Sequence, residues 1–327
     1  MRLTFFGTSQ TSPDLIFYTS PARARAKTSL PGMIDSTPMH PAPDSSQKST
    51  GWNKIWMEQQ HLQESSKHFE DSSHNWNDPE NAKRYAANAG NESDDRVKAT
   101  VAGLRLTKDM RVLDIGAGPG TLAIPLAPLV KDVTAIEPGA GMAAVLMEQC
   151  RAQGIINISC IRKRWEDIEP AQDLERPYDL VIASLSLTME DIRAALLKMA
   201  AVSCGQVCLY WFVDMPFWER MYADLWQPLH GSTYYPGPKT NCLFEVLYEA
   251  GIYANVEMMR LNKEYRFFSR NELTAFFRHR FSVTTPEQER VLDTYLAPLV
   301  RQEKDEVVVS GNSTYAKIWW ETTDQSR

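Results

Sequence analysis

The sequence predicts an α/β protein in which a mostly parallel sheet is covered by helices on both faces. Three observations carry this prediction. Strand and helix patterns alternate regularly between residues 110 and 213, which is typical of parallel strands joined by right-handed crossover helices. A cluster of glycines directly follows the first strand. With 43% hydrophobic and 23% charged residues, the chain of 327 residues can also bury a sizeable core.

Residues 1–50 differ in composition from the rest of the chain. Between residues 20 and 50 the chain is rich in Ser, Thr and Pro and holds few large apolar side chains, so burial cannot offset the entropy lost on ordering. The apolar run that begins at Leu3 is interrupted by Gly7 and therefore lacks the uninterrupted core of a signal peptide. We expect a disordered tail over residues 1–50 and a folded domain over residues 51–327.

The folded domain is expected to begin with helices. Residues 52–70 have the pattern of a polar helix. Asn77-Asp78-Pro79-Glu80 is typical of a helix start, because a capping residue precedes a proline and an acid in the first turn. That helix should end near Gly90, and another should cover residues 93–104. Together, residues 51–105 form an N-terminal helical cap.

The remaining elements follow from short β-rich runs and longer helical patterns. Strands are expected at 110–115, 133–136, 156–161, 178–184 and 206–213, with helices at 120–130, 139–152 and 189–202 between them. Beyond residue 214 we expect helices at 216–226 and 241–251, a strand at 253–266, helices at 270–280 and 286–303, and a final strand at 313–321.

Composition excludes several classes of function. The net charge of −6 disfavours a general nucleic-acid binder, and no apolar run approaches the ~18 residues of a membrane span. The 5 cysteines are odd in number and form no C-x-x-C pair, and the 6 histidines form no H-x-H or H-x-x-x-H pair, so no disulfide framework or metal site is expected. Reduced thiols suit a cytoplasmic protein.

The informative motif is the run V-L-D-I-G-A-G-P-G at residues 112–120, placed between a strand and a helix. Its glycines let the backbone approach a ligand, and the helix start offers free N–H donors. A dinucleotide-binding pattern needs glycine where Thr121 stands, so the spacing disfavours a pyrophosphate-bridged dinucleotide. Glu137 ends the second strand and can accept both hydroxyls of a ribose. The two signals together indicate a nucleoside ligand.

These residues resemble class I, Rossmann-like S-adenosylmethionine-dependent methyltransferases of types 11 and 12. The resemblance covers residues 105–213 and rests on D-I-G-A-G-P-G at 114–120, I-E-P at 136–138 and Y-D-L-V-I-A-S at 178–184. It implies a seven-stranded sheet of order 3-2-1-4-5-7-6 with the seventh strand antiparallel. By this resemblance residues 253–266 are strand six and 313–321 are strand seven, and the helices between them are an insertion.

The resemblance also implies roles for individual residues toward the cofactor S-adenosylmethionine. Asp114 would meet its amino group and Glu137 its ribose hydroxyls. Trp165 would cover the adenine face, with Arg164 where the family often has an acid. The further contacts group by the part of the cofactor they meet: the methionine moiety by Gly116, Ala117, Gly118 and Gly120; the adenine by Pro138, Met142 and Glu166; and the sulfonium by Ser184 and Leu185.

Methyl transfer is an in-line displacement in which alignment and a dry pocket matter most. It requires no metal, and a general base only if the acceptor must lose a proton; no catalytic residue is assigned. We expect lid elements at 51–105, 214–250 and 268–305. For Trp76 and Tyr85, pocket lining and ordinary packing both stay open.

The acceptor is the least determined part of the function. Ala183-Ser184-Leu185 stand where base-amino methyltransferases carry an N/D-P-P-Y/F motif, which disfavours methylation of base amino groups or of glutamine. The favoured function is methylation of a small molecule. The alternatives are a methyltransferase acting on protein or tRNA, and a non-catalytic S-adenosylmethionine-binding sensor or scaffold. The oligomeric state and the identity of the acceptor are not determined by the sequence.

Overall fold

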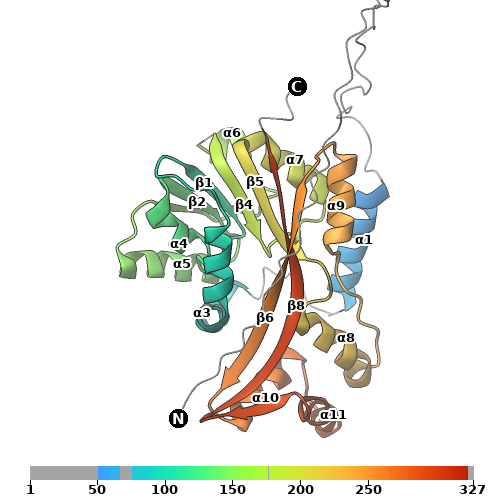
Figure 1. Ribbon diagram of the computed structural model, residues 1–327. Helices are drawn as coiled ribbons and strands as arrows, with labels where there is room; N and C mark the ends of the chain where they lie inside the picture. The colour runs from blue at the N-terminus through green and yellow to red at the C-terminus, as the bar shows by residue number, and fades with distance from the viewer. Residues whose placement is uncertain (1–50, 67–75, 176, 323–327) are drawn as a thin grey trace, which may run out of the picture. The chain divides into compact units, whose positions relative to one another are not determined.

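The computed structural model describes residues 51–66, 76–175 and 177–322. The predicted disordered tail at 1–50 lies outside the described residues. One sheet organises the described chain, with strand order β3-β2-β1-β4-β5-β8-β6 and β7 paired to β8 (Figure 1). Its strands are β1 (Arg111–Ile115), β2 (Asp132–Ile136), β3 (Ile158–Ile161), β4 (Tyr178–Ser184), β5 (Ser203–Phe212), β6 (Asn255–Phe267), β7 (Val300–Glu303) and β8 (Glu306–Glu321).

The strand β7 was not predicted, so β8 corresponds to strand seven of the sequence analysis. With that correspondence the sheet has the predicted order. Strands β1 to β5 run parallel, and β8 is antiparallel to both β5 and β6. The added strand β7 corrects the prediction of a helix at 286–303, because the helix there ends at Leu296. A tight turn in which Lys304 has φ of 52° leads into the β-branched run Val307–Val309, so the chain forms a hairpin instead.

Helices cover both faces of the sheet. One face packs on α7 (Ile192–Val202), α9 (Thr240–Glu249) and α1 (Gly51–Ser66). The other packs on α4 (Ala123–Leu126), the 3₁₀ turn Ala127–Leu129, α5 (Ala140–Gln153) and α3 (Pro79–Ala102). The short helix α6 (Pro170–Asp173) precedes β4. The predicted helix at 120–130 is cut to these short turns because Pro125 and Pro128 each lack a backbone donor.

Helix α3 begins as predicted, with the Asp78 side chain accepting hydrogen bonds from the backbone N–H groups of Glu80 and Asn81. The expected end near Gly90 and the separate helix at 93–104 are wrong, since α3 runs unbroken from Pro79 to Ala102. A glycine inside a helix costs only about 1 kcal/mol. Packing of Ala82 against α5 and of Val97 and Val101 against the sheet outweighs that cost.

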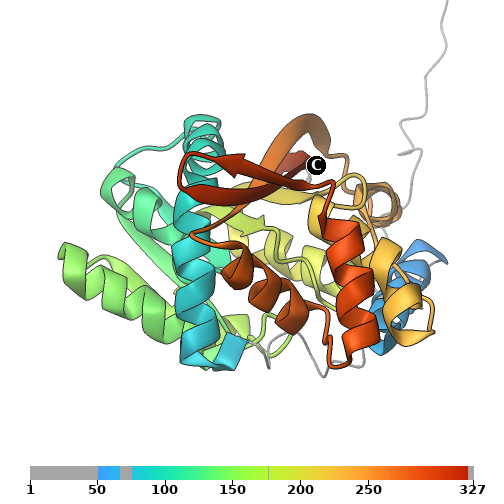
Figure 2. The same ribbon diagram turned by 90° about the horizontal axis from the view of Figure 1, so that it is seen from below.

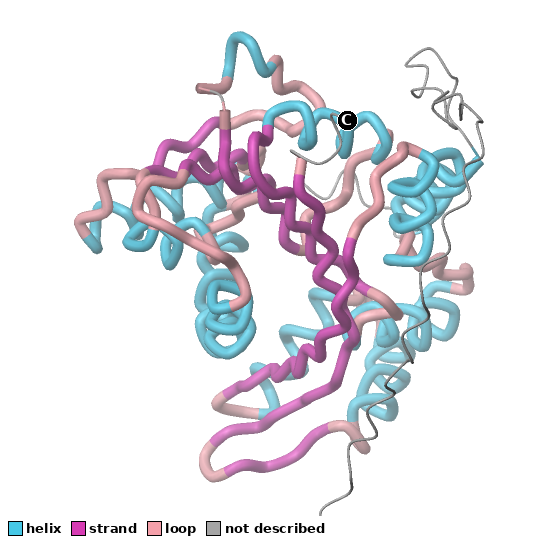
Figure 3. The backbone as a smooth tube through the Cα atoms, turned by 45° about the horizontal axis from the view of Figure 1, so that its top comes forward, coloured by secondary structure: helices cyan, strands magenta, loops and turns pink. Residues whose placement is uncertain are grey.

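A second region extends from the sheet along the outer ends of β6 and β8. Helices α8 (Phe217–His230), α10 (Arg270–Arg280) and α11 (Pro286–Leu296) pack there around their own aromatic core. We call these helices, β7 and the outer ends of β6 and β8 the lid region. In Figure 3 the strands of the sheet continue without a break into it, and the view from below in Figure 2 brings α3 in cyan and α10 and α11 in orange to red to the front.

Candidate functional site

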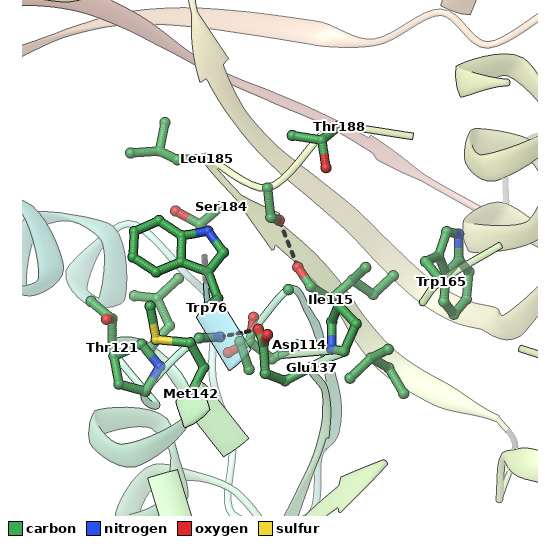
Figure 4. A pocket seen from close by; sticks show the side chains of 18 of the residues that line it. Trp76, Asp114, Ile115, Thr121, Glu137, Met142, Trp165, Ser184, Leu185 and Thr188 are labelled. Atoms are coloured by element: carbon green, nitrogen blue, oxygen red, sulfur yellow. Dashed lines mark hydrogen bonds between the residues drawn. The ribbon is translucent and has the colours of Figure 1, made fainter. Parts of the chain in front are cut away.

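A pocket of about 240 Å³ opens at the carboxyl ends of β1, β2 and β4 (Figure 4). In parallel α/β sheets this is the edge at which ligands bind. Most residues predicted to meet the cofactor line it: Asp114, Gly116, Ala117, Gly118, Glu137, Pro138, Met142, Trp165, Glu166, Ser184 and Leu185. Gly120 is not among the lining residues.

The glycine loop after β1 takes backbone conformations that favour glycine, with φ of 72° at Gly116, 57° at Gly118 and 92° at Gly120. A Cβ at Gly116 would lie 2.4 Å from the Cβ of Ser186, so this glycine lets the loops after β1 and β4 touch. A Cβ at Gly118 would meet open space, which leaves that backbone free to approach a ligand. A Cβ at Gly120 would lie 2.5 Å from Leu146 Cδ1, so Gly120 serves packing against α5.

Glu137 connects the end of β2 to the glycine loop. Its carboxylate is 6% exposed and accepts hydrogen bonds from the backbone N–H groups of Gly118 and Gly139, both at 2.8 Å. Burial raises the pKa of Glu137, and the two backbone donors oppose that rise. Each carboxylate oxygen still has acceptor capacity for a hydroxyl. The arrangement both orders the loop and presents a pair of acceptors to the pocket.

Asp114 is the penultimate residue of β1, lies beside Glu137 and is 2% exposed. Among the described residues its Oδ2 atom is buried without a hydrogen-bond partner. Burial, and then repulsion by Glu137, raises the pKa of Asp114 to about 7, against the opposing effect of the Ala123 backbone N–H and of Arg96. A buried carboxylate with an open oxygen is stabilised by a cationic donor. The floor of the pocket therefore suits an ammonium group.

Arg96 is the main pocket residue that the sequence did not reveal. It projects from the penultimate turn of α3, and its Nη1 donates to Ser184 Oγ at 3.1 Å. It carries no motif, and a helical position 18 residues before Asp114 gives no sign of where its side chain ends. The other lining residues not predicted as contacts are Ile115, Pro119, Thr121, Leu122, Ile136, Arg164, Ser186, Thr188 and Met189.

Trp76 and Tyr85 both line the pocket, which decides between the two roles left open for them. Their rings meet edge to face with centroids 5.1 Å apart. The backbone N–H of Ala140 donates to Asn77 Oδ1 at 2.9 Å, and a Cβ at Gly141 would lie 2.8 Å from the Trp76 carbonyl oxygen. The start of α5 thus holds the chain at Trp76 close against the pocket.

Trp165 borders the pocket from within the core. Its indole is 2% exposed, and Nε1 donates to the Ala195 carbonyl at 3.2 Å. Figure 4 shows Trp165 set apart from Glu137 and Met142, whereas Trp76 lies close to Met142. Trp76 is therefore better placed than Trp165 to cover a flat ring held at this end of the pocket, and a contact of Trp165 with adenine stays a prediction.

The turn after β4 is strained where it borders the pocket. Leu185 has φ of 57°, a conformation that side-chain-bearing residues rarely adopt. Two hydrogen bonds hold the turn in this shape: the Leu185 N–H donates to the Tyr210 carbonyl at 3.0 Å, and Ser186 Oγ donates to the Ile115 carbonyl at 2.6 Å. Strain that neighbouring contacts maintain is a frequent feature of functional sites.

Residues 112–203 match the family model described as a methyltransferase domain. This match identifies a methyltransferase domain at residues 112–203, and the parallel sheet with its antiparallel β8 and the glycine loop after β1 have the class I, Rossmann-like arrangement. S-adenosylmethionine is the cofactor expected of this class, and the pocket offers it a carboxylate at the end of β2 and an open glycine backbone.

Individual relatives are distant. An uncharacterized protein of Haemophilus influenzae is 26% identical over 219 residues, which cover 66% of this chain and 78% of that protein. A ribosomal RNA small subunit methyltransferase A of Desulforapulum autotrophicum is 39% identical over 66 residues, 20% of this chain and 22% of that enzyme. A solved structure described as a methyltransferase of Bacillus halodurans C-125 superposes with a TM-score of 0.49 at 16% identity, over 69% of this chain and 98% of that one.

The described residues contain neither a candidate metal site nor a candidate membrane span. No group of three or more His, Cys, Asp or Glu side chains there is placed to hold a metal ion. Within the same residues, no helix combines the length and apolar character that crossing a membrane requires.

Proposed function

We propose that this protein transfers the methyl group of S-adenosylmethionine to a small-molecule acceptor. One observation carries the proposal: the buried Glu137 carboxylate lies 2.8 Å from the Gly118 N–H, beside a stretch of loop open to the pocket. A carboxylate in that place can bind ribose hydroxyls while the loop backbone receives the methionine portion. Burial of the site excludes water from a cationic sulfur centre, and alignment of acceptor, methyl and sulfur then supplies much of the rate.

A small acceptor is favoured by the walls of the pocket. Helix α3 with Tyr85 and Trp76 borders one side, and the turn with Thr188 and Met189 borders another. We further propose that segments 51–105, 214–250 and 268–305 close over the methyl group as a lid. The net charge of −6 supports a small acceptor over nucleic acid. The five free cysteines support the cytoplasm as the compartment.

Calorimetry with S-adenosylhomocysteine tests the donor half of the proposal. Glu137→Ala removes two charge-assisted hydrogen bonds to the ribose and should weaken binding about ten- to hundredfold. Glu148→Ala, which removes an exposed acid from α5, is the matched control and should leave affinity unchanged. Absence of binding by the wild-type protein, or equal affinity of wild type and Glu137→Ala, contradicts the proposal.

Turnover tests the acceptor half. The protein is incubated with radiolabelled S-adenosylmethionine and, separately, with the small-molecule and the macromolecular fractions of a cell extract. We expect release of S-adenosylhomocysteine and label transfer with the small-molecule fraction. Transfer to the macromolecular fraction alone indicates a protein or RNA acceptor. Binding without transfer in either fraction indicates a sensor or scaffold.

A further inference from the structure

Helix α1 carries three buried polar side chains on one face. Asn53, Trp56 and Gln60 are spaced by three and four residues, which places them on the same side of the helix. All three are buried, Trp56 completely. Burying a polar group is costly unless it is hydrogen-bonded. The hydrogen-bond partners of these side chains therefore show what the helix holds in place.

Trp56 and Gln60 bond to the segment that joins β4 to α7. Trp56 Nε1 donates to the Met189 carbonyl at 2.9 Å, and Gln60 Nε2 donates to the Leu187 carbonyl at 3.4 Å. Among the described residues, each hydrogen bond that joins residues 187–189 to another element of the fold comes from these two side chains. The segment is thus held by a helix that lies 127 to 133 positions earlier in the sequence.

Asn53 holds the far end of the same segment. Its Nδ2 donates to Asp191 Oδ1 at 3.0 Å, and its Oδ1 accepts from the Arg193 N–H at 3.0 Å. Asp191 is also the N-cap of α7, because its side chain accepts from the Ala194 N–H at 2.9 Å. Asn53 therefore ties α1 to the point where α7 begins.

The residues directly after β4 are held by the sheet instead. The Leu185 N–H donates to the Tyr210 carbonyl of β5, and Ser186 Oγ donates to the Ile115 carbonyl of β1. Two parts of the fold thus share the connection between β4 and α7. The sheet fixes its beginning, and α1 fixes residues 187–191.

The part that α1 fixes borders the pocket away from Glu137. Thr188 and Met189 line the pocket, and Figure 4 shows Thr188 and Leu185 on the side opposite Glu137. In the proposed function the ribose of the donor lies at Glu137 and the sulfonium lies at Ser184. The space beside Thr188 is then left for the acceptor.

We propose that Asn53, Trp56 and Gln60 are positioning residues for methyl transfer, because they hold the wall against which the acceptor is aligned. This inference rests on the proposed function. It adds α1 to the machinery of transfer, although α1 lies outside the residues 112–203 that match the methyltransferase domain. Displacement of a reacting group by about 1 Å can cost about a hundredfold in rate. A wall that is held less firmly should therefore slow transfer without weakening the donor.

Trp56→Phe separates these two effects. The variant keeps a ring beside Trp211, whose centroid lies 6.0 Å from that of Trp56, and loses the donor to Met189. Calorimetry should find the affinity for S-adenosylhomocysteine within about twofold of wild type. Label transfer from S-adenosylmethionine to the small-molecule fraction of a cell extract should fall about ten- to hundredfold per donor-binding site. The loss should lie in the maximal rate, with the KM for S-adenosylmethionine unchanged.

Hydrogen exchange reports whether Trp56 acts through the segment. With S-adenosylhomocysteine bound, exchange at residues 187–191 should be about tenfold faster in Trp56→Phe than in wild type, because one buried hydrogen bond is lost. Exchange in β1 should not change, since the donor contacts there are untouched.

Two further variants complete the experiment. Leu247→Val is the matched control, because Leu247 of α9 is fully buried in the same core as Trp56 and its truncation removes no hydrogen bond from the segment. It should leave transfer per donor-binding site within about twofold. Asn53→Leu has nearly the same shape as the wild-type side chain and loses both bonds at the start of α7. It should reproduce the loss of transfer and decides the test if Trp56→Phe does not fold.

Unchanged transfer in folded Trp56→Phe overturns the inference, whether or not exchange at residues 187–191 is faster. Loss of transfer without faster exchange there also overturns it, and so does a donor affinity that falls in parallel with transfer. If wild type labels the macromolecular fraction alone, the small-acceptor proposal fails, and the same comparison of variants is made with that fraction. If wild type labels neither fraction, the proposed function fails and the inference fails with it.

Discussion

The sheet and the lid region differ in the kind of side chain that forms their cores. The two cores on the faces of the sheet consist mainly of aliphatic side chains such as Val181, Leu196 and Leu209. The core of the lid region is dominated by aromatic rings, among them Tyr222, Phe277 and Phe281, whose neighbouring rings stack or meet edge to face. Because the lid region has its own core, we expect that its stability can be altered without moving the strand ends that hold Asp114 and Glu137.

The lid region is also tied to the N-terminal cap through a buried charge. Glu219 of α8 is 1% exposed and pairs with Lys239 at 2.8 Å. Its Oε1 accepts from Gln63 Nε2 of α1 at 2.5 Å and from the Tyr234 hydroxyl at 3.0 Å. Pairing with a cation and hydrogen bonds of this kind offset the cost of burying a carboxylate. The buried Glu219 carboxylate is thus paired with a lysine, whereas the Asp114 carboxylate at the sheet end has an oxygen in the pocket without a hydrogen-bond partner among the described residues.

The largest effect that separates the two regions is expected from Phe277→Ala. Phe277 is fully buried among the rings of the lid core, and its truncation should lower the free energy of unfolding by about 3–5 kcal/mol. Affinity for S-adenosylhomocysteine should stay within about twofold. Urea unfolding and calorimetry measure both quantities. A large loss of donor affinity in a folded Phe277→Ala protein means that the regions are not independent.

Gly116→Ala should break the pocket rather than the lid. It adds a left-handed strain of about 1–2 kcal/mol to a clash with Ser186 of about 1–3 kcal/mol, because the new Cβ would lie 2.4 Å from Ser186 Cβ. Donor binding should be lost. Gly118→Ala is the matched control for stability, since it adds the same left-handed strain but its Cβ meets no neighbouring atom. Urea unfolding compares the two variants. Equal free energies of unfolding would show that the contact between the loops after β1 and β4 does not affect stability.

The stability of the unliganded protein should depend on pH through the ionisation of the Asp114 carboxylate. Burial raises the pKa of Asp114 from 3.8 to about 7. Its protonated form therefore contributes fully to the free energy of unfolding below about pH 4, and this contribution is lost as the pH rises through about 7. Asp114→Asn should remove that decline. Because an ammonium ligand prefers the ionised form, affinity for S-adenosylhomocysteine should rise with pH, by up to about tenfold per unit, until about pH 7. A flat affinity profile in wild type contradicts this assignment.

The smallest effect is expected from hydrogen exchange. If the lid proposal is correct, S-adenosylhomocysteine should increase protection at 76–90 and in at least one of the segments 214–240 and 268–305, by a few-fold in exchange rate, because lid elements are locally less stable than the sheet. Strand β5 is the internal reference and should not change. Protection confined to 112–145 would remove the lid from the proposal and favour an acceptor that approaches across an open face.

The elements found correctly from sequence are those whose signal is local. The strands β1 and β4 and the glycine loop are each specified within fewer than ten neighbouring residues, and Asp78 caps α3 through its own side chain. The continuous α3 and the strand β7 were missed because each depends on packing. Gly90 is tolerated by contacts at both ends of α3, and β7 forms because β8 offers it a partner.

The sequence by itself determined the class of fold, the glycine loop and the acid at the end of β2, because these follow from strand patterns and from backbone conformations that only glycine adopts freely. Only the tertiary structure decided which side chains from distant elements share the pocket. Arg96 meets Ser184 across 88 positions of sequence, and Trp76 reaches Met142 because two glycines of the β2–α5 segment leave room for it. Such neighbours are set by strand order and helix packing, which no local pattern records.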